Sequence, residues 1–510
     1  MIAINQRHLD RVSGKWTSFD DKGNEFMDAD HPYAGDLDVV GDKSLFQYIN
    51  ITHTWHGRTA FAGDMMNAQY KEQEIMKRQA AVRELSADSD FAGEMEHRFS
   101  QIGSDPAAAT LVKELQENHV ILRNKALRTL IRYGPLAVLL FVGLVVIFRW
   151  EQLYLLSVCL YALQTLIWIV TFPFTSKTLA KINRLPFKLG AYSKVLTFIA
   201  GASFQSEKLR QIQDTLTQSN VSAVHAIREL ARLSDKTSVR SNPIVYFILN
   251  AVLLWDWECV FQFEEWSVKY ASHCESWFIA LGEMESLSCF AVLKNVCSHT
   301  CFPSFTRQYG IVAEELGHPL IPNASRVTNP LSLNDEIIII SGSNMSGKTT
   351  YLRTVGINVV LARAGGPVCA EKMILSDLHI VTSMRTFDNL SEGVSTFYAE
   401  LRRIKGVLDA AKRDRNTRFL LDEIFRGTNS VDRLSGARAV ITKLSQIGVI
   451  GMLTTHDLDL CQMERANDKV SNYNFSEQYE KGQICFDYKM QPGISKTTNA
   501  RYLMEWIGIV

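Results

Sequence analysis

The sequence lacks an excess charge of one sign, a cysteine framework and an apolar leader. Lys and Arg together number 54, as do Asp and Glu, so the chain has no overall basic field of the kind an obligate nucleic-acid binder often carries. A local basic face remains compatible with this balance. The nine cysteines are scattered without paired spacings, which favours reduced thiols in the cytosol. The first residues, MIAINQRHLDRVSGKW, contain no apolar core, so we expect no signal peptide.

Length and composition indicate a globular protein of more than one domain. A chain of 510 residues exceeds what one hydrophobic core usually supports. Hydrophobic residues make up 46% and charged residues 21%, an ordinary globular balance. Changes in residue pattern predict five consecutive segments: a polar, loose lead-in (1–36), a helical core and lever segment (37–125), an apolar hairpin (126–178), a second helical segment (179–305) and an α/β domain (306–510).

Two uncharged apolar runs predict a transmembrane helical hairpin. Residues 133–148 carry no charge, Arg149-Trp150-Glu151 interrupts them, and residues 152–176 are again uncharged. The second run is long enough to cross a bilayer and the first is slightly short, so a buried hairpin inside a soluble domain stays open as the alternative. Aromatic anchors at the membrane interface are expected at Trp150, Tyr154 and Trp168.

Basic residues on both outer flanks predict the orientation of this hairpin. Cytoplasmic flanks of membrane helices are enriched in Lys and Arg. We therefore expect the chain to sit at the cytoplasmic membrane through residues 133–176, with both large segments in the cytoplasm. The flanking cations are Lys125, Arg128 and Arg132 before the hairpin, and Lys177, Lys181, Arg184 and Lys188 after it.

After residue 305, short β-branched runs alternate with helical patterns, which predicts a mostly parallel sheet with crossover helices. The apolar run 336–340 leads into a glycine loop, Gly342 to Thr349, and then into a helical stretch, 350–364. This is the context of a phosphate-binding loop. Gly342 and Gly347 let backbone N–H groups face phosphates. Lys348 is expected to reach the β- and γ-phosphates, and the Thr349 hydroxyl to ligate Mg²⁺.

Two further strands deliver polar residues to the same sheet edge. The run 418–421 ends in Asp422 and Glu423, which predicts that Asp422 joins the Mg²⁺ shell and Glu423 polarises the attacking water. The run 449–454 leads to His456, which either contacts the γ-phosphate or positions the water. Taken alone, this histidine is equally compatible with a structural role.

One cluster of possible metal ligands, Cys297-Ser-His299-Thr-Cys301, is interpreted as buried or incidental. Its spacing is tighter than the usual zinc patterns.

The C-terminal segment resembles the MutS family of DNA mismatch-repair ATPases, a branch of the ABC-type ATPases. The resemblance rests on six blocks that follow in the family's order over about 200 residues. In chain order, the first three are Gly317-His318-Pro319, Ser341-Gly-Ser-Asn344-Met345-Ser-Gly-Lys-Thr-Thr350 and Asp388-Asn-Leu-Ser-Glu-Gly-Val-Ser395-Thr-Phe397. The last three are Asp422-Glu-Ile-Phe-Arg-Gly-Thr428 with Asp432, Thr454-Thr-His456, and Phe486-Asp-Tyr-Lys489 with Gly493 and Ser495. Phe425 departs from the pattern, because the family usually has glycine there.

The resemblance implies a nucleotide site shared between two subunits. ATP and Mg²⁺ are the implied cofactors, and a homodimer with ATPase domains face to face is the implied assembly. Ser395 of one subunit would complete the site of the other in trans and act with Glu423 and His456 in catalysis. The residues expected to bind the nucleotide are Gly342, Ser343, Asn344, Met345, Ser346, Gly347, Lys348, Thr349, Thr350 and His318.

Upstream, the resemblance is weaker and implies DNA binding only by analogy. Residues 37–58 and the later Arg78-Gln79-Ala-Ala-Val82 are similar to the family's helical core and lever. No mismatch-recognition domain or DNA clamp is expected, and Phe263-Glu-Glu265 is assigned to a helix surface rather than to an inserted wedge. Candidates for a basic strip are Arg78, Arg83 and Arg98. Two hypotheses stay open. The first is a dimeric, membrane-tethered ATPase that binds DNA in a role related to mismatch repair, and the second is a mechanical or scaffold ATPase at the membrane that has lost DNA mismatch recognition.

Overall fold

The computed structural model describes residues 1–67, 69–103, 125–183, 186–218, 221–308, 310–385, 396–480 and 483–495. The chain forms two compact units, each built from segments distant in sequence. The sheet unit comprises residues 1–51, 61–89 and 287–510, and the helical unit comprises 52–60 and 90–286.

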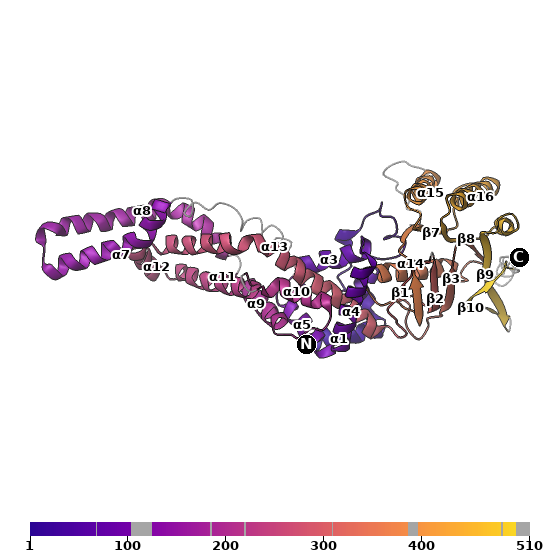
Figure 1. The fold of residues 1–510 in the computed structure, drawn as a ribbon, viewed down its shortest axis with the longest axis horizontal. Coiled ribbons are helices and arrows are strands. Elements are labelled where there is room, and N and C mark those ends of the chain that lie inside the picture. The colour runs from indigo at the N-terminus through magenta and orange to yellow at the C-terminus, as the bar shows by residue number, and fades with distance from the viewer. Residues whose placement is uncertain are drawn as a thin grey trace. The chain divides into compact units, whose positions relative to one another are not determined.

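The sheet unit contains a six-stranded, mostly parallel sheet in the order β10-β9-β4-β8-β7-β6 (Figure 1). Only the β10–β9 pair is antiparallel. This arrangement confirms the predicted α/β architecture with mostly parallel strands. The strands are β4 (Ile337–Gly342), β6 (His379–Ser383), β7 (Thr417–Asp422), β8 (Ile450–Thr455), β9 (Val470–Glu480) and β10 (Gln483–Pro492).

Helices cover both faces of the central strands. All six residues of β4, of β7 and of β8 are buried, as expected for parallel strands packed on both faces. On one face Phe419 and Leu421 pack in a core with α15 (Thr396–Arg413) and α16 (Ser430–Ile447). Leu420 points to the opposite face, where it contacts Gly356 of α14 (Lys348–Ala364).

A smaller, mainly antiparallel sheet in the order β1-β5-β2-β3 belongs to the same unit. Its β2–β3 and β2–β5 pairs are antiparallel and its β1–β5 pair is parallel. The strands are β1 (Ser304–Phe305), β2 (Ile311–Leu316), β3 (Asn329–Leu333) and β5 (Lys372–Leu375), and η4 (Leu460–Arg465) precedes β9.

The N-terminal residues are folded, and the prediction of a loose lead-in is wrong. Arg11 is 2% exposed and donates hydrogen bonds to the carbonyls of Tyr48 (2.8 Å) and Asn50 (2.9 Å). A buried guanidinium with these partners fixes α1 against the chain that follows. The elements of this part are α1 (Ile2–Val12), η1 (Lys15–Ser18), η2 (Asn24–Phe26), α2 (Leu45–Ile49), α3 (Trp55–Met66) and α4 (Glu72–Ala87).

The helical unit is all-α in its described residues. Two of its apolar helices, α7 and α8, form the predicted hairpin, with Arg149 at the turn in a left-handed conformation (φ 50°). The elements are α5 (Ser89–Ser100), α7 (Lys125–Phe148), α8 (Glu151–Asn183), α9 (Pro186–Ala200), α10 (Glu207–Thr217), α11 (Ala223–Thr237), η3 (Ser238–Ser241), α12 (Pro243–Leu253) and α13 (Trp255–Val296).

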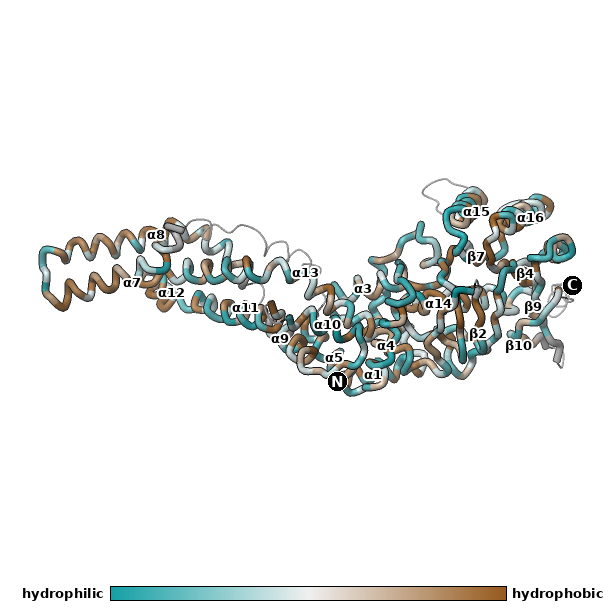
Figure 2. Tube along the Cα trace, in the orientation of Figure 1, coloured by the Kyte–Doolittle hydropathy of each residue, from teal (hydrophilic) through white to brown (hydrophobic). Residues whose placement is uncertain are grey.

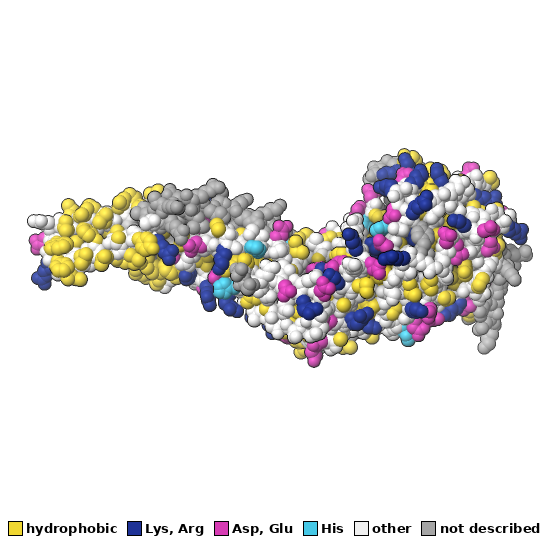
Figure 3. Space-filling view, viewed as in Figure 1, with side chains coloured by type: hydrophobic (Ala, Val, Ile, Leu, Met, Phe, Trp, Pro, Cys, Tyr) yellow, Lys and Arg dark blue, Asp and Glu magenta, His cyan; other side chains and the backbone are white. Residues whose placement is uncertain are grey.

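The hairpin exposes its apolar side chains. Hydrophobic residues run along both arms (Figure 2) and cover much of the visible face of the arms, whereas charged side chains lie at the tip (Figure 3). Only 17% of the apolar window of each arm is buried, whereas 78% of the window in α13 is buried. Within the described residues, these three helices are long and apolar enough to cross a membrane by length and composition.

A short apolar helix, α12, packs against the hairpin. Asn242 caps it by accepting hydrogen bonds from the N–H groups of Ile244 and Val245. Gln164 of α8 donates to the carbonyls of Ala251 (2.9 Å) and Val252 (2.8 Å) at its C-terminal end. The Asn242-Pro243 dipeptide therefore marks a helix start, where Pro at the first position is favourable.

Two residues of this unit differ from their predicted environments. Trp168 is 8% exposed and packs its ring against Tyr246 and Phe247 of α12, so its assignment as an interface anchor is wrong, whereas Trp150 and Tyr154 are exposed. Phe263 on α13 is 4% exposed. Its assignment to a helix surface is also wrong, because the ring lies in the interior beside Trp266.

Candidate functional site

The loop between β4 and α14 has a backbone that requires glycine at two points. Gly342 has φ 147°, and a Cβ there would lie 2.6 Å from the carbonyl oxygen of Phe475. Gly347 has φ 106° and immediately precedes α14. The loop therefore curls over the N-terminus of α14, whose first N–H groups lack intrahelical partners and form an anion-binding site.

Lys348 lies folded back under this loop. Its Nζ donates hydrogen bonds to the carbonyls of Gly342 (2.9 Å) and Ser343 (2.8 Å), and it lies 3.5 Å from Nε2 of His456. Burial lowers the pKa of Lys348, and the carboxylates of Glu423 and Asp422 partly offset that effect. The ammonium group is thus held inside the loop, where a bound phosphate would lie.

Asp422 accepts hydrogen bonds from hydroxyl groups on two neighbouring elements. Its Oδ1 accepts hydrogen bonds from Oγ1 of Thr349 (2.9 Å) and of Thr454 (2.5 Å). Oδ2 accepts from Nη2 of Arg426 at 2.8 Å. A carboxylate beside a threonine hydroxyl at the start of α14 is an oxygen donor set that fits Mg²⁺.

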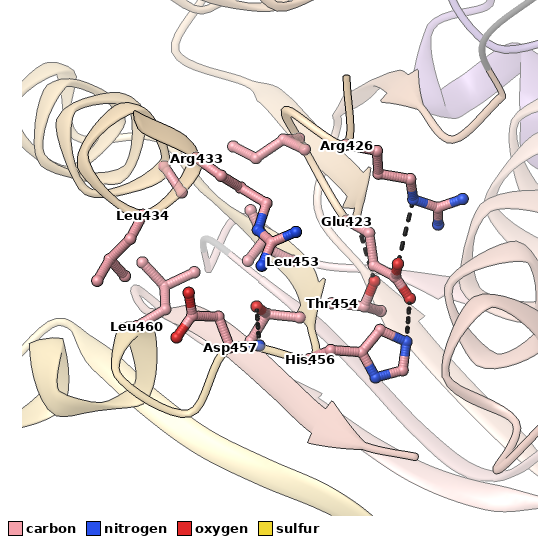
Figure 4. A pocket seen from close by; sticks show the side chains of 12 residues that line it. Glu423, Arg426, Arg433, Leu434, Leu453, Thr454, His456, Asp457 and Leu460 are labelled. Carbon is pink, nitrogen blue, oxygen red and sulfur yellow. Dashed lines mark hydrogen bonds and ion pairs between the residues drawn. The ribbon is translucent and has the colours of Figure 1, made fainter. Parts of the chain in front are cut away.

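Glu423 follows directly and forms an ion pair with His456, as Figure 4 shows. Nε2 of His456 lies 2.6 Å from Oε1, and Nε of Arg426 lies 3.1 Å from Oε2. Burial alone would raise the pKa of Glu423, but the hydrogen bond from His456 and the nearby cations hold that pKa below its ordinary value. The carboxylate is therefore ionised at neutral pH and is oriented by two partners.

A cavity of about 530 Å³ opens beside the phosphate loop. His318 forms part of its wall, and burial lowers the pKa of this imidazole to about 3, so it is neutral at physiological pH. Nδ1 of His318 accepts a hydrogen bond from the N–H of Leu320. The lining includes seven of the predicted nucleotide-binding residues of the loop and helix: Asn344, Met345, Ser346, Gly347, Lys348, Thr349 and Thr350.

The structure thus brings most of the predicted site residues to one sheet edge. Ser395 lies outside the described residues, which resume at Thr396, the first residue of α15. Two contributors were not predicted as site residues. Arg426 bridges both carboxylates, and its signal was present in the motif that follows Glu423. Glu477 accepts a hydrogen bond from the Ser343 hydroxyl, and no sequence signal links that position on β9 to the loop.

Phe425 replaces glycine of the family pattern in a backbone that favours glycine. Its φ is 66°, in the left-handed region. The side chain is 5% exposed, and its ring packs edge-on against Phe397 with centroids 6.2 Å apart. A Cβ at Gly436 would come within 2.9 Å of the Phe425 ring. The ring of Phe425 therefore fits because Gly436 of α16 has no side chain, and it is held by packing against Phe397.

Each of the three arginines predicted to form a basic strip has a partner within the protein. Arg78 is fully buried, forms an ion pair with Asp64 at 2.5 Å, and donates from Nε to the carbonyl of Ala364 at 2.8 Å. A guanidinium with these buried partners is structural, and its assignment to a DNA-facing strip is wrong. Arg83 stacks over the Phe302 ring, and Arg98 pairs with Glu94.

Comparison with known proteins agrees with this geometry. Residues 338–506 match the family model of MutS domain V. Relatives described as DNA mismatch repair protein MutS are found in Geobacillus sp. (strain WCH70), at 28% identity over 47% of this chain, in Aquifex pyrophilus, at 33% over 38%, and in Methanococcoides burtonii, at 28% over 48%. The matched parts cover only 28%, 23% and 29% of those proteins. The C-terminal part of the chain is therefore similar to MutS domain V, which is an ABC-type ATPase domain.

Proposed function

We propose that the chain is a membrane-tethered, dimeric, MutS-like ATPase that converts ATP and water into ADP and phosphate. The observation that carries this proposal is the convergence of Lys348, Asp422 and Glu423 at one edge of the sheet, beside the N-terminus of α14. A cation, an oxygen donor pair and an ionised carboxylate are the parts that phosphoryl transfer to water requires.

Each group has a distinct task in this proposal. The loop N–H groups and Lys348 bind the β- and γ-phosphates, and the cavity wall at His318 takes the nucleoside side. Thr349 and Asp422 would hold Mg²⁺, which would neutralise charge on the phosphate oxygens. Glu423, held as a carboxylate by His456 and Arg426, orients and polarises the attacking water.

We further propose that two copies complete each other's sites. Met345, at the apex of the phosphate loop, is 83% exposed. An exposed apolar side chain at the edge of a nucleotide site supports a partner surface there. In this proposal Ser395 of the second copy contacts the γ-phosphate held by Lys348 of the first.

Replacement of the loop lysine tests the proposed activity. Lys348→Ala removes the cation that contacts the phosphates, so we expect ATP turnover to fall at least about 100-fold, with ATP binding weakened. Lys469→Ala is the matched control, because Lys469 is half exposed and pairs only with Asp335. Unchanged turnover in Lys348→Ala would contradict the site assignment.

Membrane attachment rests on α7 and α8, whose apolar windows have mean hydropathy of 2.2 and 2.0 and are mostly exposed. Ile244, Phe247 and Ile248 of α12 add exposed apolar surface beside them. Burying such surface in lipid is favourable, and both large segments would then lie in the cytoplasm. The full chain should stay with the membrane pellet after alkaline carbonate washing, and its release into the soluble fraction would contradict a bilayer span.

The partner of this ATPase is DNA or a protein. Resemblance to MutS supports DNA, whereas the buried, paired Arg78 favours the alternative of a mechanical or scaffold ATPase at the membrane. Binding to duplex DNA that weakens steeply with salt would support the first. Absence of binding at low salt, with ATP present, would support the second.

A further inference from the structure

A pair of cysteine thiols in the sheet unit adjoins the loop that forms one wall of the nucleotide cavity. Cys297 follows the end of α13, and Cys369 lies five residues beyond the end of α14. Their Sγ atoms are 3.3 Å apart, and both side chains are buried. The residues that follow Cys297, Ser298 and His299, are exposed, so the buried pair lies next to a solvent-exposed turn of the chain.

The two cations near this pair, Arg326 and Lys294, both favour the thiolate form of Cys297. Nη1 of Arg326 lies 3.2 Å from Sγ of Cys297. The hydrogen bond from the Cys369 thiol, followed by the charges of Arg326 and Lys294, lowers the pKa of Cys297, whereas the same contact and burial raise the pKa of Cys369. One sulfur is thus disposed to be a thiolate and the other to remain a thiol, the asymmetry found in reactive cysteine pairs.

Arg326 connects this pair to the wall of the cavity. Its Nε donates to the carbonyl of His318 (2.9 Å), and its Nη2 donates to that of Ile321 (2.7 Å). Both residues line the nucleotide cavity. The same guanidinium therefore holds the cavity loop, residues 317–326, and the sulfur of Cys297.

Cys369 is joined to the opposite end of the same loop. Its carbonyl accepts a hydrogen bond from the N–H of Gly317 (2.8 Å), and its own N–H donates to Oδ1 of Asn358 (2.7 Å). Asn358 lies on α14, and its Nδ2 donates to the carbonyl of Gly317. Both cysteines thus contact the cavity loop directly, Cys297 at Arg326 and Cys369 at Gly317.

We propose that Cys297 and Cys369 form a reversible disulfide that regulates nucleotide binding, with hydrogen peroxide as the oxidant. The Cys297 thiolate attacks one peroxide oxygen, and the O–O bond breaks to give a sulfenic acid and hydroxide. The Cys369 sulfur then attacks the sulfenic sulfur, the S–O bond breaks, and water leaves once the Cys369 proton is transferred. In total, two thiols and one peroxide give one disulfide and two waters.

Disulfide formation changes the cavity wall for two reasons. The sulfurs must close from 3.3 Å to about 2 Å, which pulls the end of α13 and the chain after α14 together. The negative charge that Arg326 faces at Cys297 also disappears, because a disulfide sulfur is neutral. Since Arg326 holds the carbonyl of His318, we expect the oxidised site to bind nucleotide less tightly. This inference rests on the proposed function, because it assigns regulation to the same site.

The test compares nucleotide binding by the reduced and the peroxide-treated full chain. We expect peptide mapping by mass spectrometry to find Cys297 linked to Cys369, and the affinity for a fluorescent ATP analogue to fall about fivefold or more, with recovery in dithiothreitol. Cys297→Ser should abolish the response, so that the affinity of this variant is the same before and after peroxide treatment. The matched control removes the two exposed thiols, Cys159→Ser with Cys485→Ser, and should respond as the natural chain does.

Three results would overturn the proposal. They are absence of the linked peptide at saturating peroxide, an unchanged nucleotide affinity when the link is formed, and a persisting response in Cys297→Ser. Failure of the reduced protein to bind nucleotide would instead contradict the proposed function, and the linked peptide would then still decide whether the two thiols are a redox pair.

Discussion

Phe425 shows how two opposing effects at one residue can be weighed. Its left-handed backbone costs a non-glycine residue about 1 to 2 kcal/mol. Its buried ring, in contact with Phe397, is worth more, because truncating a buried phenylalanine to alanine typically costs about 3 to 5 kcal/mol. Packing therefore outweighs strain, which explains how the chain tolerates a departure from glycine two residues after Glu423, the proposed catalytic carboxylate.

Two substitutions at this position separate the effects. Phe425→Ala loses the packing and keeps the strain, whereas Phe425→Gly loses both. We expect both variants to unfold at lower denaturant concentration than the natural protein, with the glycine variant more stable than the alanine variant by about 1 kcal/mol. Equal midpoints, or a less stable glycine variant, would contradict the strain assigned to φ 66°.

Contacts between residues that are distant in sequence could not be predicted. Lys348, Asp422 and His456 were found because each follows a buried strand at a fixed place in a motif. Cys369 and Glu477 come to the site from elements far along the chain, and nothing adjacent to them in sequence marks the contact. Arg78 was misassigned for the same reason, because its neighbours in sequence do not reveal Asp64 as its buried partner.

Among the elements, the strands that carry the site were predictable and the N-terminal helix was not. The runs that precede Asp422 and Thr454 have apolar centres, residues 419–421 and 449–453. The structure extends the first predicted strand by one residue at each end and shifts the second by one residue. The helix α1 is largely polar, and it is fixed by Arg11 against carbonyls 37 and 39 residues away. The hydrophobic periodicity of the sequence does not predict that contact.

The loop before α2 is expected to stabilise the end of β6 through Asp36. This carboxylate is 1% exposed and accepts hydrogen bonds from Oγ1 of Thr382 (2.7 Å), from the N–H groups of Met384 (3.1 Å) and Arg385 (3.0 Å), and from Nη1 of Arg403 (3.2 Å). Asp36→Ala removes these hydrogen bonds from a buried position, so we expect a loss of about 3 to 5 kcal/mol.

Chemical denaturation of the full chain measures this effect. The control is Asp42→Ala, which removes an exposed carboxylate of the same region that pairs with Lys22. We expect its midpoint to match the natural protein. If Asp36→Ala were as stable as Asp42→Ala, the hydrogen bonds to β6 and α15 would not be the source of stability here.

At the scale of the whole molecule, the segments do not pack in the order in which they occur. Residues 1–51 and 61–89 belong to the same compact unit as residues 287–510. The change to apolar composition at residue 133 was visible in sequence, and so was the change to alternating strands and helices after residue 305. The association of the N-terminal segment with the C-terminal sheet was not, because composition does not encode which segments pack together.

The central claim is that the sheet unit hydrolyses ATP through Glu423, and a single-turnover experiment tests it most directly. The full chain and its Glu423→Gln variant are mixed with limiting labelled ATP, and bound nucleotide and released phosphate are followed together. Glutamine keeps the size of the side chain but is a far weaker base, so we predict that the variant retains ATP and releases phosphate at least about 100-fold more slowly. Glu371→Gln, which alters an exposed glutamate of the same unit, should behave as the natural chain does. Phosphate release by Glu423→Gln at the natural rate would contradict the account.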